Sequence, residues 1–129
     1  MFSSFFFQKS TQEIGIAGET AALSYLQKNK YTLIARNWRC PLGELDLIML
    51  HGEYLVFVEV KARRGLKISK ELIFANIHQK KIRKIKSLID VFLYHQPKLR
   101  AKKIRIDIIG IYFNSDNSIK ELIHLPGAY

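Results

Sequence analysis

Apolar residues recur with a helical period near the start of the chain. Ile16, Leu23 and Leu26 fall on one helical face, and Asn29 follows as a stop signal. This spacing predicts a helix over residues 11–28, and we expect its apolar face to pack against a sheet.

Strand-like patterns follow this helix. Leu33 and Ala35 fall on one face of the first pattern, and the Cys-Pro-Leu-Gly sequence at residues 40–43 has turn composition. The His-Gly pair at residues 51–52 is a tight-turn signal. We therefore expect strands over residues 31–38, 44–50 and 53–61.

A long amphipathic helix is predicted in the second half of the chain. Asn76 is a candidate N-cap, the pattern runs to about Gln96, and Pro97 lies just past the end. The apolar stripe of this helix consists of Ile77, Ile82, Ile85, Leu88, Ile89, Phe92 and Leu93.

Two further strands complete the pattern, over residues 103–113 and 119–125, with a turn at residues 115–118. The predicted order is α-β-β-β-α-β-β. A strand, a helix and a second strand form a crossover unit, so we expect an α/β fold with a mixed central sheet flanked by helices. The length of 129 residues fits one domain. We assign it to residues 14–129, after an N-terminal extension at residues 1–13.

Positive charge is concentrated in one part of the chain. The net charge is +10, but residues 61–105 alone hold fifteen Lys or Arg and two acids, a net charge of +13. Such a basic block is typical of nucleic-acid binding, of binding to an anionic membrane, or of a surface that only aids solubility.

Composition excludes several other classes of protein. No apolar run approaches the ~20 residues that span a bilayer, and the Phe-rich start lacks the features of a signal peptide. Cys40 is the only cysteine, which excludes an intramolecular disulfide and a cysteine-rich zinc site. We expect a cytoplasmic protein with no membrane partner.

Acidic side chains occupy positions where the pattern predicts apolar ones. Glu19 lies on the apolar face of the first helix, and Asp46 shares a strand face with Ile48. Glu59 and Lys61 lie on a face of a strand that is otherwise apolar. A structural interpretation remains for each: an arginine could satisfy Glu19, and Glu59 could pair with Lys61. A buried pair, however, adds little net stability over apolar packing.

A hairpin would bring two of these acids together. With a two-residue loop at residues 51–52, Leu50 pairs with Glu53, and Asp46 lies diagonally across from Glu59, about 7–8 Å away at the backbone. A four-residue loop would place the two acids directly opposite, and a three-residue loop would place them on opposite faces.

Such a pair of carboxylates requires compensation. At a separation of about 5 Å they repel by roughly 3 kcal/mol at an effective dielectric near 20. Either one acid is protonated or a divalent cation binds between them. Oxygen ligands without cysteine or a histidine pair favour Mg²⁺ or Mn²⁺ over zinc.

These residues resemble the metal site of the PD-(D/E)xK nuclease superfamily: Asp46 is followed after twelve residues by Glu59-Val60-Lys61. The chain is also similar to the uncharacterised YraN-like family, which resembles archaeal Holliday-junction resolvases in fold. The resemblance implies a single restriction-endonuclease-like domain. The matching segments are residues 18–19, 37–40, 43–48, 56–63, 105–107 and 124–129.

The resemblance also implies an activity, a metal-dependent endonuclease that hydrolyses phosphodiester bonds in DNA, with branched DNA as one candidate substrate. Asp46 and Glu59 would bind Mg²⁺ or Mn²⁺, with the Val60 carbonyl as a third ligand. Lys61 would orient the attacking water or stabilise charge on the phosphate, and Glu19 would complete the site. Resolvases cut two strands, so a homodimer is an expectation by analogy, although no residue indicates one.

Further residues complete the set of candidates. Glu44 is a weaker candidate for the acidic site, and Asp107 either supports the site or only pairs with Arg105. A nucleic-acid-binding module that keeps the nuclease fold but cuts nothing is the alternative function. The candidates for phosphate contact, some of which a solvated helix face would also explain, are Arg36, Arg39, Arg63, Arg64, Lys80, Lys81, Arg83 and Lys84.

Overall fold

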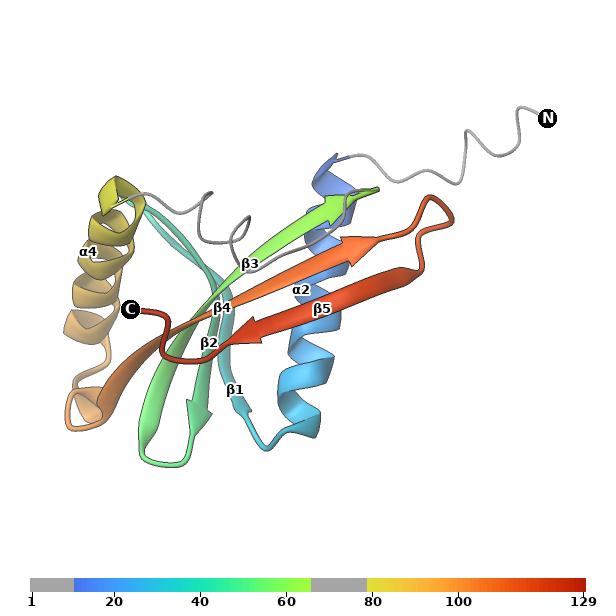
Figure 1. Ribbon diagram of the computed structural model, residues 1–129. Helices are drawn as coiled ribbons and strands as arrows, with labels where there is room; N and C mark the ends of the chain where they lie inside the picture. The colour runs from blue at the N-terminus through green and yellow to red at the C-terminus, as the bar shows by residue number, and fades with distance from the viewer. Residues whose placement is uncertain (1–10, 66–78) are drawn as a thin grey trace.

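The computed structural model describes residues 11–65 and 79–129, which form a five-stranded sheet with a helix on each face (Figure 1). The predicted order of helices and strands is confirmed. Along the chain the elements are α2 (Thr11–Lys28), β1 (Thr32–Cys40), β2 (Gly43–His51), β3 (Tyr54–Arg64), α4 (Gln79–His95), the 3₁₀ turn η1 (Pro97–Leu99), β4 (Lys103–Phe113) and β5 (Ile119–Leu125).

The strands lie side by side in the order β1-β2-β3-β4-β5. β3 and β4 run parallel, and the chain passes through α4 between them. The other neighbouring pairs are antiparallel hairpins. The predicted mixed sheet flanked by helices is therefore confirmed, and its parallel pair is the predicted crossover unit.

Each helix buries its apolar face against one side of the sheet. On one side, Leu26 of α2 packs in a cluster with Leu47 and Val58 of the sheet. On the other side, the α4 stripe centred on Ile85 and Phe92 packs against the sheet, as its sequence pattern predicts. Within the described residues, neither helix has both the length and the hydropathy needed to cross a membrane.

The predicted register of the β2–β3 hairpin is wrong by two residues. The loop consists of Gly52 and Glu53 instead of residues 51–52, so Leu50 pairs with Leu55 and not with Glu53. Gly52 adopts a φ of +59°, which glycine takes up without steric cost and which therefore fixes the turn one position later than expected. If this register continued, Asp46 would be level with Glu59 instead of diagonal to it, but the pairing ends at Leu47 and Val58.

The predicted apolar face of α2 is confirmed in part, and that of β1 is wrong. Leu26 is buried and Leu23 packs against the core, but Ile16 is 54% exposed, because the buried face of α2 runs through Ile14, Gly18, Ala22 and Leu26. In β1 the register shifts between Leu33 and Ala35, so these two residues pack on opposite sides of the sheet. An extra residue at a β-bulge reverses the alternation that a regular strand would have.

The long helix begins within the described residues at Gln79, whereas the sequence predicts a start at Asn76. Asn76 and the preceding loop lie outside the described residues. The predicted strands over 103–113 and 119–125 match β4 and β5. β1 and β2 each extend one or two residues further than expected at an end.

A buried polar network holds the sheet to its C-terminal turn. Asp107, which is fully buried, accepts hydrogen bonds from Arg105, from the Tyr31 hydroxyl and from the Gly127 N–H, and it also contacts His124 at 2.7 Å. Burial alone would raise the pKa of Asp107, but the hydrogen bonds with His124 and Arg105 outweigh it and lower the pKa to about 2. These contacts favour the structural interpretation of Asp107.

Candidate functional site

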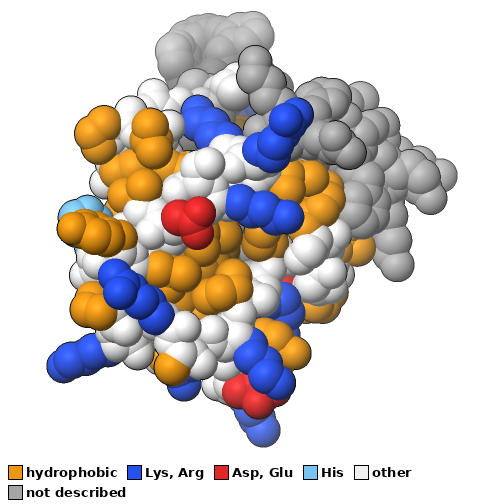
Figure 2. All heavy atoms as spheres, turned by 90° about the vertical axis from the view of Figure 1, so that its left-hand side faces the viewer, with side chains coloured by type: hydrophobic (Ala, Val, Ile, Leu, Met, Phe, Trp, Pro, Cys, Tyr) orange, Lys and Arg blue, Asp and Glu red, His pale blue; other side chains and the backbone are white. Residues whose placement is uncertain are grey.

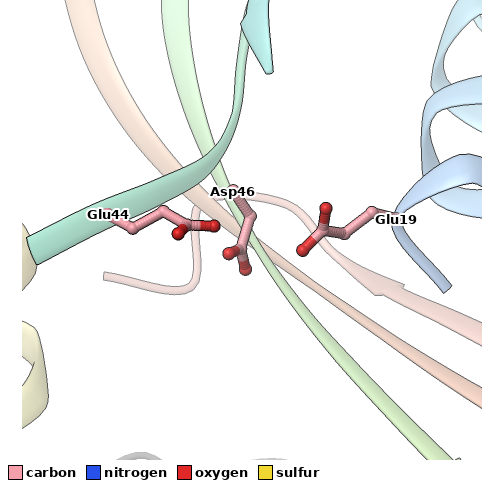
Figure 3. Close-up of side chains that lie close together, drawn as sticks. All are labelled: Glu19, Glu44 and Asp46. Carbon is pink, nitrogen blue, oxygen red and sulfur yellow. The ribbon is translucent and has the colours of Figure 1, made fainter. Parts of the chain in front are cut away.

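Three carboxylates converge where α2 meets β2. Glu19 comes from α2, and Glu44 and Asp46 come from β2 (Figure 3). One oxygen from each side chain lies within 4.8 Å of the others, and Asp46 stands between the two glutamates. Within the described residues this cluster has the donors that a hard divalent cation prefers.

A local irregularity in β2 turns Asp46 towards α2. Leu45 packs in the α4-side core and Leu47 in the α2-side core, although residues two apart in a regular strand share a face. The residue opposite Asp46 on β1 is Asn37, which adopts a left-handed φ of +53°. The irregularity therefore places Asp46 beside Glu19, whereas regular alternation would have placed it on the same face of the strand as Ile48.

The ladder between β2 and β3 ends beside the site. Their pairing ends at Leu47 and Val58, so the next residues do not form a regular ladder. Asp46 Oδ2 instead accepts a hydrogen bond from the Val60 N–H at 2.9 Å. This contact uses the N–H of Val60, a different group from the carbonyl that the sequence predicts as a metal ligand.

A close approach of α2 to β3 brings Glu19 to the cluster. A Cβ atom added to Gly18 would lie 2.6 Å from the Ala62 Cβ, so only glycine allows the helix to pack this closely. Glu19 is the next residue along the helix. Its side chain is 16% exposed and lies 3.9 Å from the Arg36 guanidinium.

Glu59 faces the other helix. Its carboxylate forms an ion pair of 2.8 Å with Lys81 of α4 and lies 3.6 Å from Lys61 Nζ. Glu59 is therefore not part of the three-carboxylate cluster, although the sequence predicts it as a metal ligand with Asp46. The third carboxylate of the cluster is instead Glu44, which the sequence predicts as a weaker candidate for the acidic site.

Electrostatic coupling nevertheless links Glu59 to the cluster. Burial raises the pKa of Asp46 to about 8, and the negative charge of Glu59 is the second cause of this increase. Burial also raises the pKa of Glu19, against an opposing hydrogen bond with Asn37. The pKa of Lys61 is lowered, first by burial and then by Lys81.

Protonation of Asp46 is the expected state at neutral pH without a bound cation, because its pKa lies above 7. A divalent cation would favour the ionised carboxylate and release that proton. The raised pKa of Asp46 corresponds to the first of the two compensations that the sequence predicts, protonation of one acid.

The chain matches a known protein family. The model of the Uncharacterised protein family UPF0102 matches residues 18–111. The chain belongs to this family.

Individual UPF0102 proteins match over most of their length. The chain is 34% identical over 116 residues to one from Desulforamulus reducens, an alignment that covers 89% of this chain and 93% of the relative. It is 35% identical over 118 residues to one from Caldicellulosiruptor saccharolyticus, covering 92% and 98%. A UPF0102 protein from Legionella pneumophila is 47% identical over 75 residues, covering 58% and 62%.

The segment matched by the UPF0102 model includes the whole site, namely Glu19, Glu44, Asp46, Glu59 and Lys61. UPF0102 is a family without an assigned activity, so membership supplies no reaction. The chemistry has to be argued from the geometry of the side chains.

Predicted phosphate-binding residues differ in their surroundings. Arg36 also donates to the Thr20 hydroxyl, and Arg39 forms a 2.8 Å ion pair with Glu44, so both lie at the rim of the cluster. These two guanidinium groups offset part of the negative charge of the cluster.

The remaining basic candidates come from β3 and α4. Lys84 lies against Gly43 at the β1–β2 turn: a Cβ atom added to Gly43 would be 3.0 Å from the Cε atom of Lys84. Arg63 donates to the Ala62 carbonyl, and Arg64 donates to Asn117 at 3.4 Å, on the side of β5. The side chain of Lys80 lies outside the described residues.

Sequence reasoning did not identify Asn37 as part of the site. Asn37 combines a left-handed backbone conformation with a hydrogen bond to Glu19, and the left-handed conformation has a signal in the sequence. Asparagine is several-fold enriched at positive φ, and Asn37 stands inside an otherwise regular strand pattern. That position alone indicates an interruption of the strand beside the acidic residues.

Proposed function

We propose that this protein is a metal-dependent nuclease that hydrolyses phosphodiester bonds in DNA. The observation that carries the proposal is the cluster of Glu19, Glu44 and Asp46, beside which stand two lysines bound to Glu59. Carboxylates that could bind a hard cation next to half-buried lysines suit a phosphate diester, because it carries one negative charge and develops more as it is attacked, and cations stabilise that charge.

The chemistry of the donors fits Mg²⁺ or Mn²⁺. All three side chains supply oxygen, and none of the described cluster members is a cysteine or a histidine. The raised pKa values of Asp46 and Glu19 support the same conclusion, because uncompensated charge is disfavoured there. Glu19, Glu44 and Asp46 would hold the cation.

A bound divalent cation stabilises charge on a phosphate oxygen and lowers the pKa of an attacking water. The protein supplies the positioning. Lys61 is anchored 3.6 Å from Glu59, and burial lowers its pKa, so its amine gives up a proton more readily than that of an ordinary lysine. Lys61 would orient the water or donate a hydrogen bond to the phosphate, and Lys81 would keep Glu59 in place.

A cleavage assay with a matched pair of variants tests this function. Linear, flap and four-way-junction DNA are incubated with wild-type protein in Mg²⁺, Mn²⁺ or EDTA. Asp46→Asn keeps the shape of the side chain but removes its charge, and Glu121→Gln makes the same change on an exposed position of β5. We expect metal-dependent cleavage by wild type and Glu121→Gln, and loss of cleavage with retained binding in Asp46→Asn.

Other outcomes discriminate between the candidate functions. Binding of these DNAs without cleavage of any of them would contradict the nuclease and support the non-catalytic nucleic-acid-binding module. Failure to bind any DNA would contradict both. Cleavage that survives in Asp46→Asn would show that the activity resides elsewhere.

A further inference from the structure

A second surface lies on another flank of α4. Lys81, which binds Glu59, and Lys86 are five residues apart, which corresponds to a rotation of about 140° around a helix. Lys86 therefore faces away from the acidic cluster, towards β4 and the C-terminal residues. Two adjoining hollows open there, with volumes of about 400 and 420 Å³.

Tyr129 lines both hollows. The backbone just before it is anchored, since the Gly127 N–H donates to Asp107 and the Ala128 N–H donates to the Ile106 carbonyl. Tyr129 itself is 42% exposed. An aromatic ring that is held at its base and accessible between two hollows is suited to stacking against a flat ligand.

Charge and apolar surface combine around this ring. Arg83 and Lys86 line one hollow, and Lys86 also lines the other, whose floor includes Ile89 and Ile104. Figure 2, which looks onto the α4 side, shows hydrophobic side chains exposed between Lys and Arg side chains. Asp90 also lines the second hollow, where its carboxylate can accept hydrogen bonds from amino groups.

We infer that this surface binds single-stranded nucleic acid, with an unpaired base stacked on Tyr129 and the adjacent phosphates on Arg83 and Lys86. The inference rests on the proposed function, in that it extends the nucleic-acid surface from the acidic cluster to another flank of α4. Aromatic side chains between cations are the elements from which single-strand-binding sites are built.

The occupant follows from the combination of features. An acidic peptide would use the two cations but would leave the hollows beside the ring unfilled. A continuous duplex presents phosphates but keeps its bases inside the stack, away from Tyr129. An unpaired nucleotide places a phosphate and a base side by side, and here Lys86 and Tyr129 line the same two hollows.

Fluorescence anisotropy in EDTA tests this inference without depending on cleavage. The probes are a blunt duplex and the same duplex with a ten-nucleotide single-stranded extension, made as DNA and as RNA. The variants are Tyr129→Ala, its conservative control Tyr129→Phe, and Arg83→Ala/Lys86→Ala, with Lys120→Ala on β5 as a control for charge.

We expect Tyr129→Ala to weaken binding of the extended probe by roughly 5- to 100-fold, the range of stacking on one aromatic residue, and to leave blunt-duplex binding unchanged. Tyr129→Phe should bind as wild type. The Arg83→Ala/Lys86→Ala variant should reduce the slope of log affinity against log salt by about 1.4, as expected for two single-strand phosphate contacts, and Lys120→Ala should not.

Equal affinity of Tyr129→Ala and wild type for the extended probe would overturn the inference but leave the proposed nuclease standing. Equal losses on blunt and extended probes would overturn it as well, because stacking of an unpaired base acts on the extension alone. If wild type bound neither probe, the proposed function would fail together with this extension of it.

Discussion

Two glycines in α2 allow a sharp test of how the helix reaches the site. A Cβ added to Gly15 meets nothing within 4 Å, whereas a Cβ added to Gly18 lies 2.6 Å from the Ala62 Cβ. Both substitutions to alanine favour the helix by roughly 0.5–1 kcal/mol. Only Gly18→Ala must also separate two atoms by about 1 Å to reach normal contact, because unstrained carbon atoms stand ~3.5–4 Å apart.

Overpacking of this kind costs roughly 1–3 kcal/mol. Gly15→Ala should therefore raise the free energy of unfolding by about 0.5–1 kcal/mol, and Gly18→Ala should be less stable than Gly15→Ala by about 1–3 kcal/mol. With a urea slope of ~2 kcal/mol/M, the two midpoints should differ by about 0.5–1.5 M.

Urea unfolding followed by circular dichroism measures both midpoints. Since helix propensity changes equally in the two variants, their difference reports the packing of α2 on β3 alone. Equal stabilisation by both substitutions would refute the close contact between Gly18 and Ala62. Gly18→Ala should also weaken Mg²⁺ binding, because moving the helix away displaces Glu19 from the cluster.

Substitutions at three other positions test the site and its support by urea unfolding. Asp107→Asn should cost ~3 kcal/mol at pH 7, because Arg105 loses its buried partner. The lowered pKa of Asp107, about 2 against 3.8, should make wild type lose about 2 kcal/mol between pH 4 and 2, and Asp107→Asn should not show this loss. Asn37→Ala should be about 1 kcal/mol less stable than Asn37→Gly, because alanine disfavours a φ of +53°. Mg²⁺ should raise the wild-type midpoint more at pH 9 than at pH 6, because Asp46, with a pKa of about 8, is ionised only at the higher pH; Asp46→Asn should abolish the difference.

Periodicity predicted the elements well because each one carries its own local signal. The stripe centred on Ile85 and Phe92 identifies α4, and the turn composition at residues 40–43 separates β1 from β2. The order of the elements then favoured a mixed sheet through the crossover unit between β3 and β4.

Register and facing could not be predicted in the same way, because they depend on single-residue irregularities. The bulge between Leu33 and Ala35 reverses the facing of β1, and a change of facing between Leu45 and Leu47 reverses that of β2. Period-two alternation carries no information on where an extra residue is inserted, and a shift of one residue moves every later side chain to the other face.

The same irregularities explain why the carboxylates that lie together differ from the predicted pair. Regular alternation places Asp46 and Glu59 on one face and makes them the natural pair. In the structure the shift in β2 turns Asp46 to Glu19, while Glu59 stays on the α4 side with Lys81. Glu44 joins the cluster because it lies two residues before Asp46, on the segment of β2 whose facing changes with it.

Charge balance in the site follows from this arrangement and links pH to cation binding. Arg36 and Arg39 compensate Glu19 and Glu44 from the rim, and Lys81 compensates Glu59 from α4. Asp46 has no arginine or lysine ion pair within the described part of the chain to oppose burial, which, with the negative charge of Glu59 as the second cause, raises its pKa to about 8. In the proposed metal site a cation would displace the proton of this central carboxylate, so affinity for Mg²⁺ should increase with pH up to about 8 and level off above it.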